Sequence, residues 1–251
     1  MKKILELKNV SLTYQTATDE INAINGLSFD CLEGDFVSII GPSGCGKTSI
    51  LSMIAGLLEP SSGSIRIDGK EVTKTNSSLG YMLQKDHLFP WRTIEKNVYL
   101  PLEIKKINTK EKREYANYLL DKYGLKDFKK KYPEQLSGGM RQRVALIRTL
   151  VSNPKILLLD EPFSALDSQT RLSVNNDVYQ IIKQEKKTTV LVTHDISEAI
   201  SMSDIIIVLS DRPSKVKNIH KPNIEGETPI HKRESKNFSK WFEILWRELN
   251  Q

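Results

Sequence analysis

Eight consecutive residues carry the strongest chemical pattern in the chain. Residues 41–48 read Gly-Pro-Ser-Gly-Cys-Gly-Lys-Thr and match G-x-x-x-x-G-K-[ST] at every fixed position. Glycines let successive backbone N–H groups turn inward around phosphate oxygens, and the N-terminal end of a following helix adds positive charge. Lys47 would neutralise the outer phosphates and the Thr48 hydroxyl would ligate Mg²⁺. The pattern therefore predicts a site for a nucleotide phosphate.

Two adjacent carboxylates follow an apolar run further along the chain. Residues 156–159 are all aliphatic and lead directly to Asp160 and Glu161. This is the layout of a buried strand that delivers a carboxylate to the metal side of a phosphate site. We expect Asp160 to face the metal and Glu161 to act as general base on the attacking water.

A serine and two glycines stand where a further helix is expected to begin. The free N–H groups of such a helix start, with the Ser137 hydroxyl, could bind an anion; an ordinary helix cap is the alternative. Because the chain already has a complete phosphate loop, a second anion-binding helix start favours a phosphate held from two sides, by two copies of the domain. His194 follows another strand pattern at the same edge as Asp160, which favours a functional histidine over a structural one.

Together these motifs resemble the ATP-binding subunits of ABC transporters, over nearly the whole chain up to about Arg212. Residues 137–140 are similar to the signature loop of that family, although Met140 stands where glutamine is common. Residues 164–167 resemble the loop that crosses between two subunits. The resemblance implies ATP and Mg²⁺ as cofactors, with Tyr14 stacked on adenine and Gln84 touching Mg²⁺ while reporting to a membrane subunit.

The resemblance also implies a set of site residues. The expected catalytic residues are Glu161, His194, Gln84 and Lys47, and the expected Mg²⁺ ligands are Thr48, Gln84 and Asp160. The expected nucleotide contacts are Tyr14, Gly41, Pro42, Ser43, Gly44, Cys45, Gly46, Lys47, Thr48, Ser49, Ser137, Gly138, Gly139 and Asp167.

Hydrophobic periodicity indicates the elements that must position these residues. Buried-strand patterns alternate with helical segments, as a parallel sheet with crossover helices requires. These patterns occupy residues 36–40, 156–160, 188–193 and 205–209. An extended segment at 4–14 opens the chain, and helical spacing dominates 93–132. We predict an α/β fold: a P-loop NTPase core with a mostly parallel sheet, an N-terminal antiparallel β subdomain and an inserted α-helical subdomain.

The expected domain organisation is an ABC ATP-binding domain followed by a short extension. The ATP-binding domain is placed at 1–212, with the helical subdomain at about 93–152, and the extension at 213–251. An amphipathic helix at about 235–250 gives the extension one apolar stripe. We expect that stripe to pack on the chain's own domain, with a partner subunit as the alternative. Its residues are Phe238, Trp241, Phe242, Leu245, Trp246 and Leu249.

Composition bounds the class of protein. A chain of 251 residues with 39% hydrophobic and 27% charged residues is typical of a globular protein with one large domain. No apolar run approaches the roughly 18 residues of a membrane-spanning helix. The N-terminus lacks a signal-peptide pattern, and Cys31 and Cys45 are expected to be free thiols. We expect a cytoplasmic protein, peripheral on the inner face of the cell membrane.

The expected function is to power an importer for a small anion such as nitrate, a sulfonate or taurine, or for a thiamine precursor. Expected partners are a second copy in an ATP-sandwich dimer, permease subunits that meet a patch at Gln84 and residues 88–91, and indirectly an extracellular or periplasmic substrate-binding protein. The net charge of +6 leaves a soluble ABC-type ATPase on nucleic acid or ribosomes as the alternative. Such proteins usually carry two ATP-binding cassettes or a long coiled-coil insertion. The sequence shows neither, so no nucleic acid partner is expected. A plain P-loop kinase would leave the signature loop unexplained.

Overall fold

The computed structural model describes residues 2–15 and 18–250. The chain forms two compact units. One comprises Met1–Ser77 with Lys186–Gln251, and the other comprises Ser78–Glu185.

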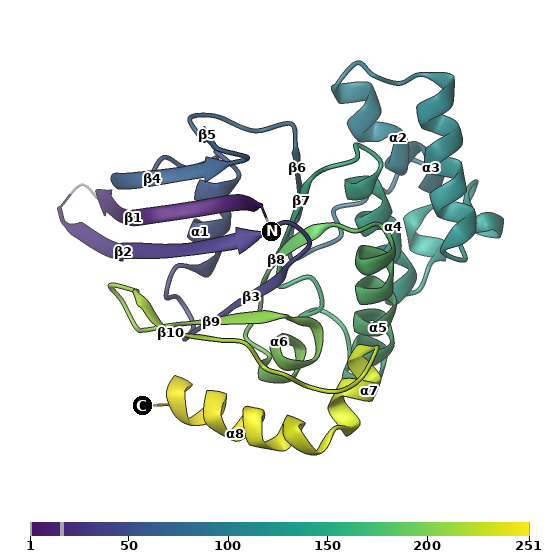
Figure 1. The fold of residues 1–251 in the computed structure, drawn as a ribbon. Helices are drawn as coiled ribbons and strands as arrows, with labels where there is room; N and C mark the ends of the chain where they lie inside the picture. Colours follow the sequence, from purple (N-terminus) through teal and green to yellow (C-terminus); the bar gives the residue numbers. More distant parts are fainter. Residues whose placement is uncertain (1, 16–17, 251) are drawn as a thin grey trace. The chain divides into compact units, whose positions relative to one another are not determined.

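The first unit contains an antiparallel sheet near the N-terminus. Its order is β2 (Glu20–Leu32), β1 (Lys3–Gln15), β4 (Ser62–Ile67) and β5 (Lys70–Glu71), and β2, β1 and β4 lie side by side in Figure 1. The apolar side chains of β1, among them Leu5, Leu7, Val10 and Leu12, are buried while intervening polar residues face outward. This alternation is what a half-buried strand requires, and it forms the predicted β subdomain.

A second set of strands in the same unit carries the phosphate loop. Here β3 (Phe36–Ile40) pairs in parallel with both β8 (Thr188–Val192) and β9 (Ile205–Leu209), and β10 (Val216–His220) pairs antiparallel with β9. All residues of β3 and β8 are buried, as expected for parallel strands covered on both faces. The helices are α1 (Lys47–Ile54), α6 (Ile196–Met202), α7 (Pro229–Glu234) and α8 (Lys236–Leu249).

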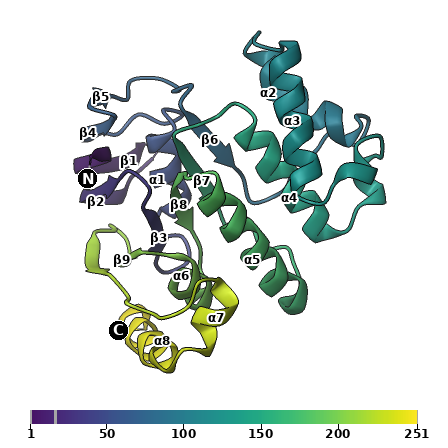
Figure 2. The ribbon, with the colours of Figure 1, turned by 45° about the vertical axis from the view of Figure 1, so that its right-hand side comes forward.

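The second unit is mainly helical. A parallel pair of strands, β6 (Leu79–Met82) and β7 (Ile156–Asp160), is joined by the inserted helices. These are α2 (Ile94–Ile104), α3 (Lys110–Lys122), the short 3-10 turns η1 (Lys126–Phe128) and η2 (Pro133–Gln135), and α4 (Gly138–Leu150). The long helix α5 (Ser168–Gln184) follows β7. Helices α2 and α3 lie beside each other and beside α4 in both views (Figures 1 and 2). The parallel strands, the antiparallel subdomain and these helices confirm the predicted fold class.

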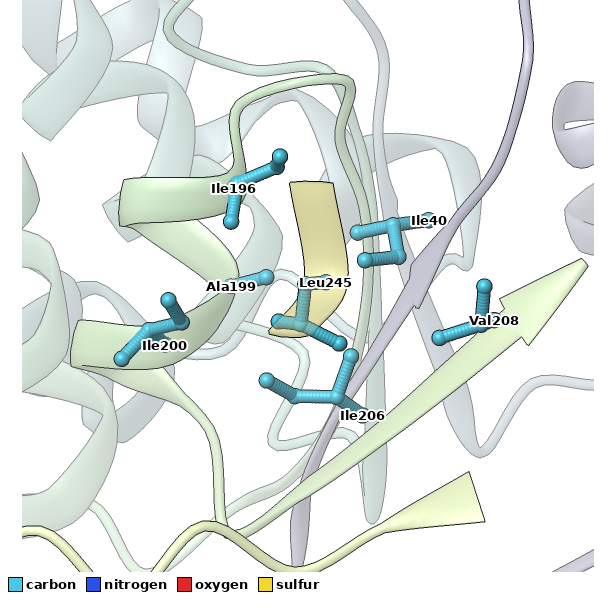
Figure 3. Close-up of a cluster of buried hydrophobic side chains, with 7 residues drawn as sticks. All are labelled: Ile40, Ile196, Ala199, Ile200, Ile206, Val208 and Leu245. Atoms are coloured by element: carbon cyan, nitrogen blue, oxygen red, sulfur yellow. The ribbon is translucent and has the colours of Figure 1, made fainter. Parts of the chain in front are cut away.

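The apolar stripe of α8 packs on the chain's own first unit. Leu245 is fully buried among residues of β3, α6 and β9 (Figure 3), and most of the stripe packs around it, whereas Trp246 is 55% exposed. The cluster consists of Ile40, Ile196, Ala199, Ile200, Ile206, Val208 and Leu245. The stripe therefore packs on the chain's own domain, as expected, and the partner-subunit alternative is not needed to cover it. No helix within the described residues is both long and apolar enough to span a bilayer.

Candidate nucleotide-binding site

The phosphate loop connects the end of β3 to the start of α1. Gly44 and Gly46 have φ values of +77° and +99°, in the left-handed region that glycine adopts without steric cost. Gly41 is required by packing, since a Cβ there would lie 2.9 Å from Cys45 Sγ and 3.0 Å from Leu209 Cβ. Backbone conformation therefore requires glycine at two of these positions, and close packing requires it at the third. Together the glycines leave a cradle that side chains would otherwise fill.

The side chain of Lys47 packs against this loop, and only 7% of the residue is exposed. Its Nζ donates to the carbonyl oxygens of Gly41 and Pro42, each at 2.8 Å, and lies 3.9 Å from Cys45 Sγ. Sulfur is a weak acceptor that a phosphate oxygen can replace. Burial raises the pKa of the Cys45 thiol, and both Cys31 and Cys45 are free thiols, as expected.

Tyr14 and Ser49 meet beside the loop. The Tyr14 hydroxyl lies 2.8 Å from Ser49 Oγ in a hydrogen bond, and the residue as a whole is 39% exposed. Thr48, one residue earlier in α1, is exposed. The structure therefore brings together the expected adenine-stacking residue and the start of the phosphate-binding helix.

His194 lies between two tethered neighbours at the end of β8. The Thr193 hydroxyl donates to Glu198 Oε2 at 2.6 Å, and Asp195 Oδ1 accepts the N–H groups of Ser197 and Glu198 at 2.8 and 3.1 Å. The histidine itself is exposed. The hydrogen bonds of its two neighbours therefore fix the His194 backbone, whereas its side chain is exposed.

In the second unit, Asp160 stands at the end of β7 and is only 6% exposed. The hydroxyl of Tyr81 in β6 donates to Asp160 Oδ2 at 3.4 Å. Tyr81 was not anticipated from the sequence, because only the pairing of β6 with β7, Tyr81 opposite Leu158, reveals its proximity. The next residue, Glu161, has a φ of +44°. Such a conformation in a non-glycine residue costs about 1–3 kcal/mol and is found preferentially at functional sites.

A short hydrogen-bond chain links Gln84 to the backbone of Glu161. Gln84 Nε2 donates to Ser164 Oγ at 3.2 Å, and Ser164 Oγ donates to the Glu161 carbonyl at 3.0 Å. Ser164 belongs to the expected crossing loop, but this link was not predicted. Two of the expected catalytic residues are therefore connected through one hydroxyl.

The expected signature loop caps α4. Ser137 is exposed, and its Oγ accepts the Met140 N–H at 3.3 Å. A Cβ at Gly139 would lie 2.6 Å from Val174 Cγ2, so the approach of α5 alone explains that glycine. Asp167 caps α5 through the Thr170 N–H at 3.0 Å, and hydrogen bonding with Thr170 lowers the pKa of Asp167. Both helix starts face outward.

The expected partner patch is only partly a surface. Leu88 is 8% exposed, so its assignment to the surface patch was wrong, whereas Trp91 is 71% exposed. Asn97, fully buried in α2, fixes this segment: its Oδ1 accepts the Phe89 N–H at 2.7 Å and its Nδ2 donates to the Phe89 and Arg92 carbonyls at 3.1 and 3.0 Å. Burial of Leu88 follows because these bonds fold the segment inward.

The donor set suits a hard divalent cation. Thr48, Gln84 and Asp160 offer a hydroxyl, an amide and a carboxylate oxygen, the ligand types that Mg²⁺ prefers. Among the residues that the structure describes there is no group of three or more His, Cys, Asp or Glu side chains that could hold a metal alone. The donor types, Thr48 in the first unit and Gln84 and Asp160 in the second, therefore fit a metal that takes its remaining ligands from phosphates and water, as Mg²⁺ does in nucleotide sites.

Comparison with known proteins places the chain in a family. The family model described as "ABC transporter" matches residues 24–164. An uncharacterized ABC transporter ATP-binding protein YtlC of Bacillus subtilis is 49% identical, with 98% of this chain and 95% of that protein aligned. The aliphatic sulfonates import ATP-binding protein SsuB of Bacillus cereus is 39% identical over the same shares.

A solved structure gives the same result. The dimeric post-hydrolysis state of the ATP-binding cassette MJ0796, bound to ADP and Pi, superposes with a TM-score of 0.73 and 35% identity, covering 87% of this chain and 98% of that one. The chain therefore belongs to the ABC transporter family, as a subunit that binds and hydrolyses ATP.

Proposed function

We propose that this chain drives a membrane importer for a small anion such as an aliphatic sulfonate. Two features that suit the phosphates of ATP carry the ATP-driven part of the proposal: the glycine-lined loop beside Lys47 and the exposed helix start at Ser137. The similarity to SsuB favours a sulfonate, and nitrate, taurine and thiamine precursors are further candidates.

The proposed domains are 1–212, with a helical subdomain at about 93–152, and the extension 213–251.

The proposed site residues divide by role. Tyr14 stacks on adenine, the loop from Gly41 to Ser49 binds the phosphates, and Asp167 with the signature loop completes the site from a second copy. Thr48, Gln84 and Asp160 would hold Mg²⁺, which when bound would neutralise charge on the outer phosphates.

Hydrolysis needs a positioned water and stabilised charge. Glu161 accepts the proton of the water whose oxygen attacks the γ-phosphorus, while the bond to the leaving phosphate oxygen breaks. His194 and Lys47 donate to the transferring oxygens, where negative charge accumulates. The left-handed backbone of Glu161 fixes the direction in which its side chain projects just after β7 ends.

Shared sites between two copies can be tested by complementation. Lys47→Ala removes the phosphate-loop lysine, and Ser137→Glu places a negative charge at the signature helix start, so each variant alone should be inactive. A mixed dimer would contain one intact site, built from the loop of the Ser137→Glu copy and the signature helix of the Lys47→Ala copy. ATPase activity should therefore reappear on mixing. If the mixture stays as inactive as its components, the shared site is wrong.

The import function and its partners are tested on the assembled transporter. We propose that permease subunits and a substrate-binding protein complete it. The complex purified from membranes with a tagged chain should hydrolyse ATP faster when that binding protein and an aliphatic sulfonate are added, and nitrate, taurine and a thiamine precursor are measured in parallel. A complex that none of these solutes stimulates would argue against an importer of this class.

The charge distribution supports a position on the inner membrane face. The unit Ser78–Glu185 has 19 Lys and Arg against 13 Asp and Glu, a net +6, so the rest of the chain is neutral. Basic residues near an anionic membrane surface contribute about 1 kcal/mol each. Vesicles with anionic lipid should therefore retain the chain at low salt, and neutral vesicles should not. Binding to RNA with a steep salt dependence, but not to vesicles, would favour the nucleic-acid alternative.

A further inference from the structure

We infer that Arg212 is a positioning residue for the phosphate loop. It lies in the turn 210–215 between β9 and β10, outside every motif described above. Its Nε donates to the Gly44 carbonyl, and a Cβ at Gly44 would lie 2.9 Å from its Nη2 and 3.8 Å from its Cζ. The guanidinium therefore covers the outer side of the loop at its fourth residue.

The contact fixes one peptide plane of the loop. The peptide that joins Gly44 to Cys45 is planar, and in a trans peptide the carbonyl and the N–H point in opposite directions. With its carbonyl held by Arg212, its N–H turns toward the inside of the loop, where Cys45 N donates to the Pro42 carbonyl at 3.3 Å. Lys47 donates to the same carbonyl. Arg212 thus holds the Gly44–Cys45 peptide in one orientation, and with it the curvature of the loop around the position proposed for phosphate.

The turn that carries Arg212 is itself anchored. Ser214 is fully buried, donates its N–H to the Ala23 carbonyl at 2.9 Å and accepts the Asn25 N–H at 2.9 Å. The side chain between them, Ile24, supports the phosphate loop, because a Cβ at Gly46 would lie 3.2 Å from Ile24 Cγ1. One stretch of β2 therefore holds both the turn and the loop, so Arg212 is fixed relative to its target.

The proposed effect is confined to ligands that use the N–H groups of the loop. A pre-oriented loop loses less conformational freedom when it binds phosphate. ATP, ADP and pyrophosphate share the phosphates that the loop would hold, whereas adenosine does not. Arg212 should therefore change the affinities of the first three and leave that of adenosine unchanged.

The experiment compares Arg212→Ala, Arg212→Lys and a control, Lys215→Ala, by calorimetric titration with ADP, pyrophosphate and adenosine. Lys215 is an exposed cation in the same turn. Arg212→Ala should raise the Kd of ADP and pyrophosphate at least about tenfold, the loss expected for one hydrogen bond to a charged group. Arg212→Lys should restore part of this affinity, and Lys215→Ala should stay within about twofold. In turnover, KM for ATP should rise while kcat holds, as for lost uniform binding.

The outcomes separate this inference from the proposed function on which it rests. Wild-type protein that binds neither ADP nor pyrophosphate would overturn the nucleotide site itself. Wild-type binding with an unchanged Arg212→Ala variant would overturn only the role of Arg212. An equal loss in Lys215→Ala, or a loss for adenosine, would also overturn it, since general charge or folding would then be the cause. Melting without ligand checks folding, and Arg212→Lys serves if Arg212→Ala is unstable.

Discussion

The side-chain amide of Gln84 lies 3.2 Å from the hydroxyl of Ser164 and donates a hydrogen bond to it. The same hydroxyl donates to the main-chain carbonyl of Glu161 at 3.0 Å, and the Ser164 N–H also reaches that carbonyl at 3.2 Å. A displacement of Gln84 can therefore be transmitted through Ser164 to the backbone of Glu161. That backbone has a left-handed conformation. This gives a proposed sensor of the membrane subunit a direct connection to the proposed general base.

Ser164→Ala should weaken this connection. The variant removes the hydroxyl that both accepts from Gln84 and donates to Glu161, a loss of about 1 kcal/mol, or roughly fivefold in kcat. Steady-state ATPase assays measure the effect, with Ser168→Ala, an exposed serine at the start of α5, as the matched control. Equal turnover in the two variants would show that the link has no role in hydrolysis.

Glu161→Gln should separate binding from hydrolysis. The amide cannot accept the proton of the attacking water, so the rate should fall at least about tenfold, while ATP affinity is retained because the phosphate loop is untouched. Single-turnover assays and equilibrium titration measure the two quantities. Size measurement with Mg-ATP should show a dimer at micromolar protein. Wild-type turnover would remove Glu161 from the catalytic role, and a monomer would oppose the ATP-sandwich arrangement.

Leu245→Ala should destabilise the first unit far more than Trp246→Ala. Leu245 is fully buried in the cluster of Figure 3, and truncating such a leucine to alanine costs about 3 kcal/mol. Trp246 is 55% exposed on the same helix and stacks on Phe242 with ring centroids 6.1 Å apart, so its loss should cost only about 0.5–1.5 kcal/mol. Urea unfolding of the two variants provides the comparison. Similar midpoints would mean that α8 does not dock in solution as it does in the structure.

The Glu185 carboxylate should make stability depend on pH in the acid range. Burial raises its pKa, but hydrogen bonds from Lys122 at 2.8 Å and Tyr123 at 2.6 Å outweigh burial and hold the pKa below its usual 4.5. A lowered pKa stabilises the fold above the unfolded-state value, and this contribution disappears as pH falls through the folded value.

Glu185→Gln should therefore cost about 1–2 kcal/mol at pH 7, and the difference from wild type should shrink at lower pH. The change is expected below pH 4.5, the usual value for this carboxyl. Urea unfolding at several pH values checks it, with the exposed Glu134→Gln as control. A difference that does not vary with pH would show that the carboxylate charge is not the source.

Some strands could not be predicted from the sequence, for a physical reason. Strands β2, β6 and β10 were not predicted: β2 includes Gly26 at a φ of +68° and pairs with β1 through register shifts that break a regular alternation. The five residues of β10 are mostly exposed at an edge of the sheet, so they show no hydrophobic pattern. Leu88 was misplaced because its burial depends on Asn97, nine residues later and on another element.

Local chemistry in the sequence by itself determined the phosphate loop, the buried strands at 36–40 and 156–160, and the family. Glycine spacing and continuous aliphatic runs act on the local backbone and involve only residues close together in the sequence, so both can be recognised without the fold. Only the tertiary structure decided that Ser164 joins Gln84 to Glu161, that Arg212 covers Gly44 and that Leu245 is buried. Each of these depends on contacts between residues far apart in the chain, because side chains meet there only after strand pairing and helix packing have set their positions.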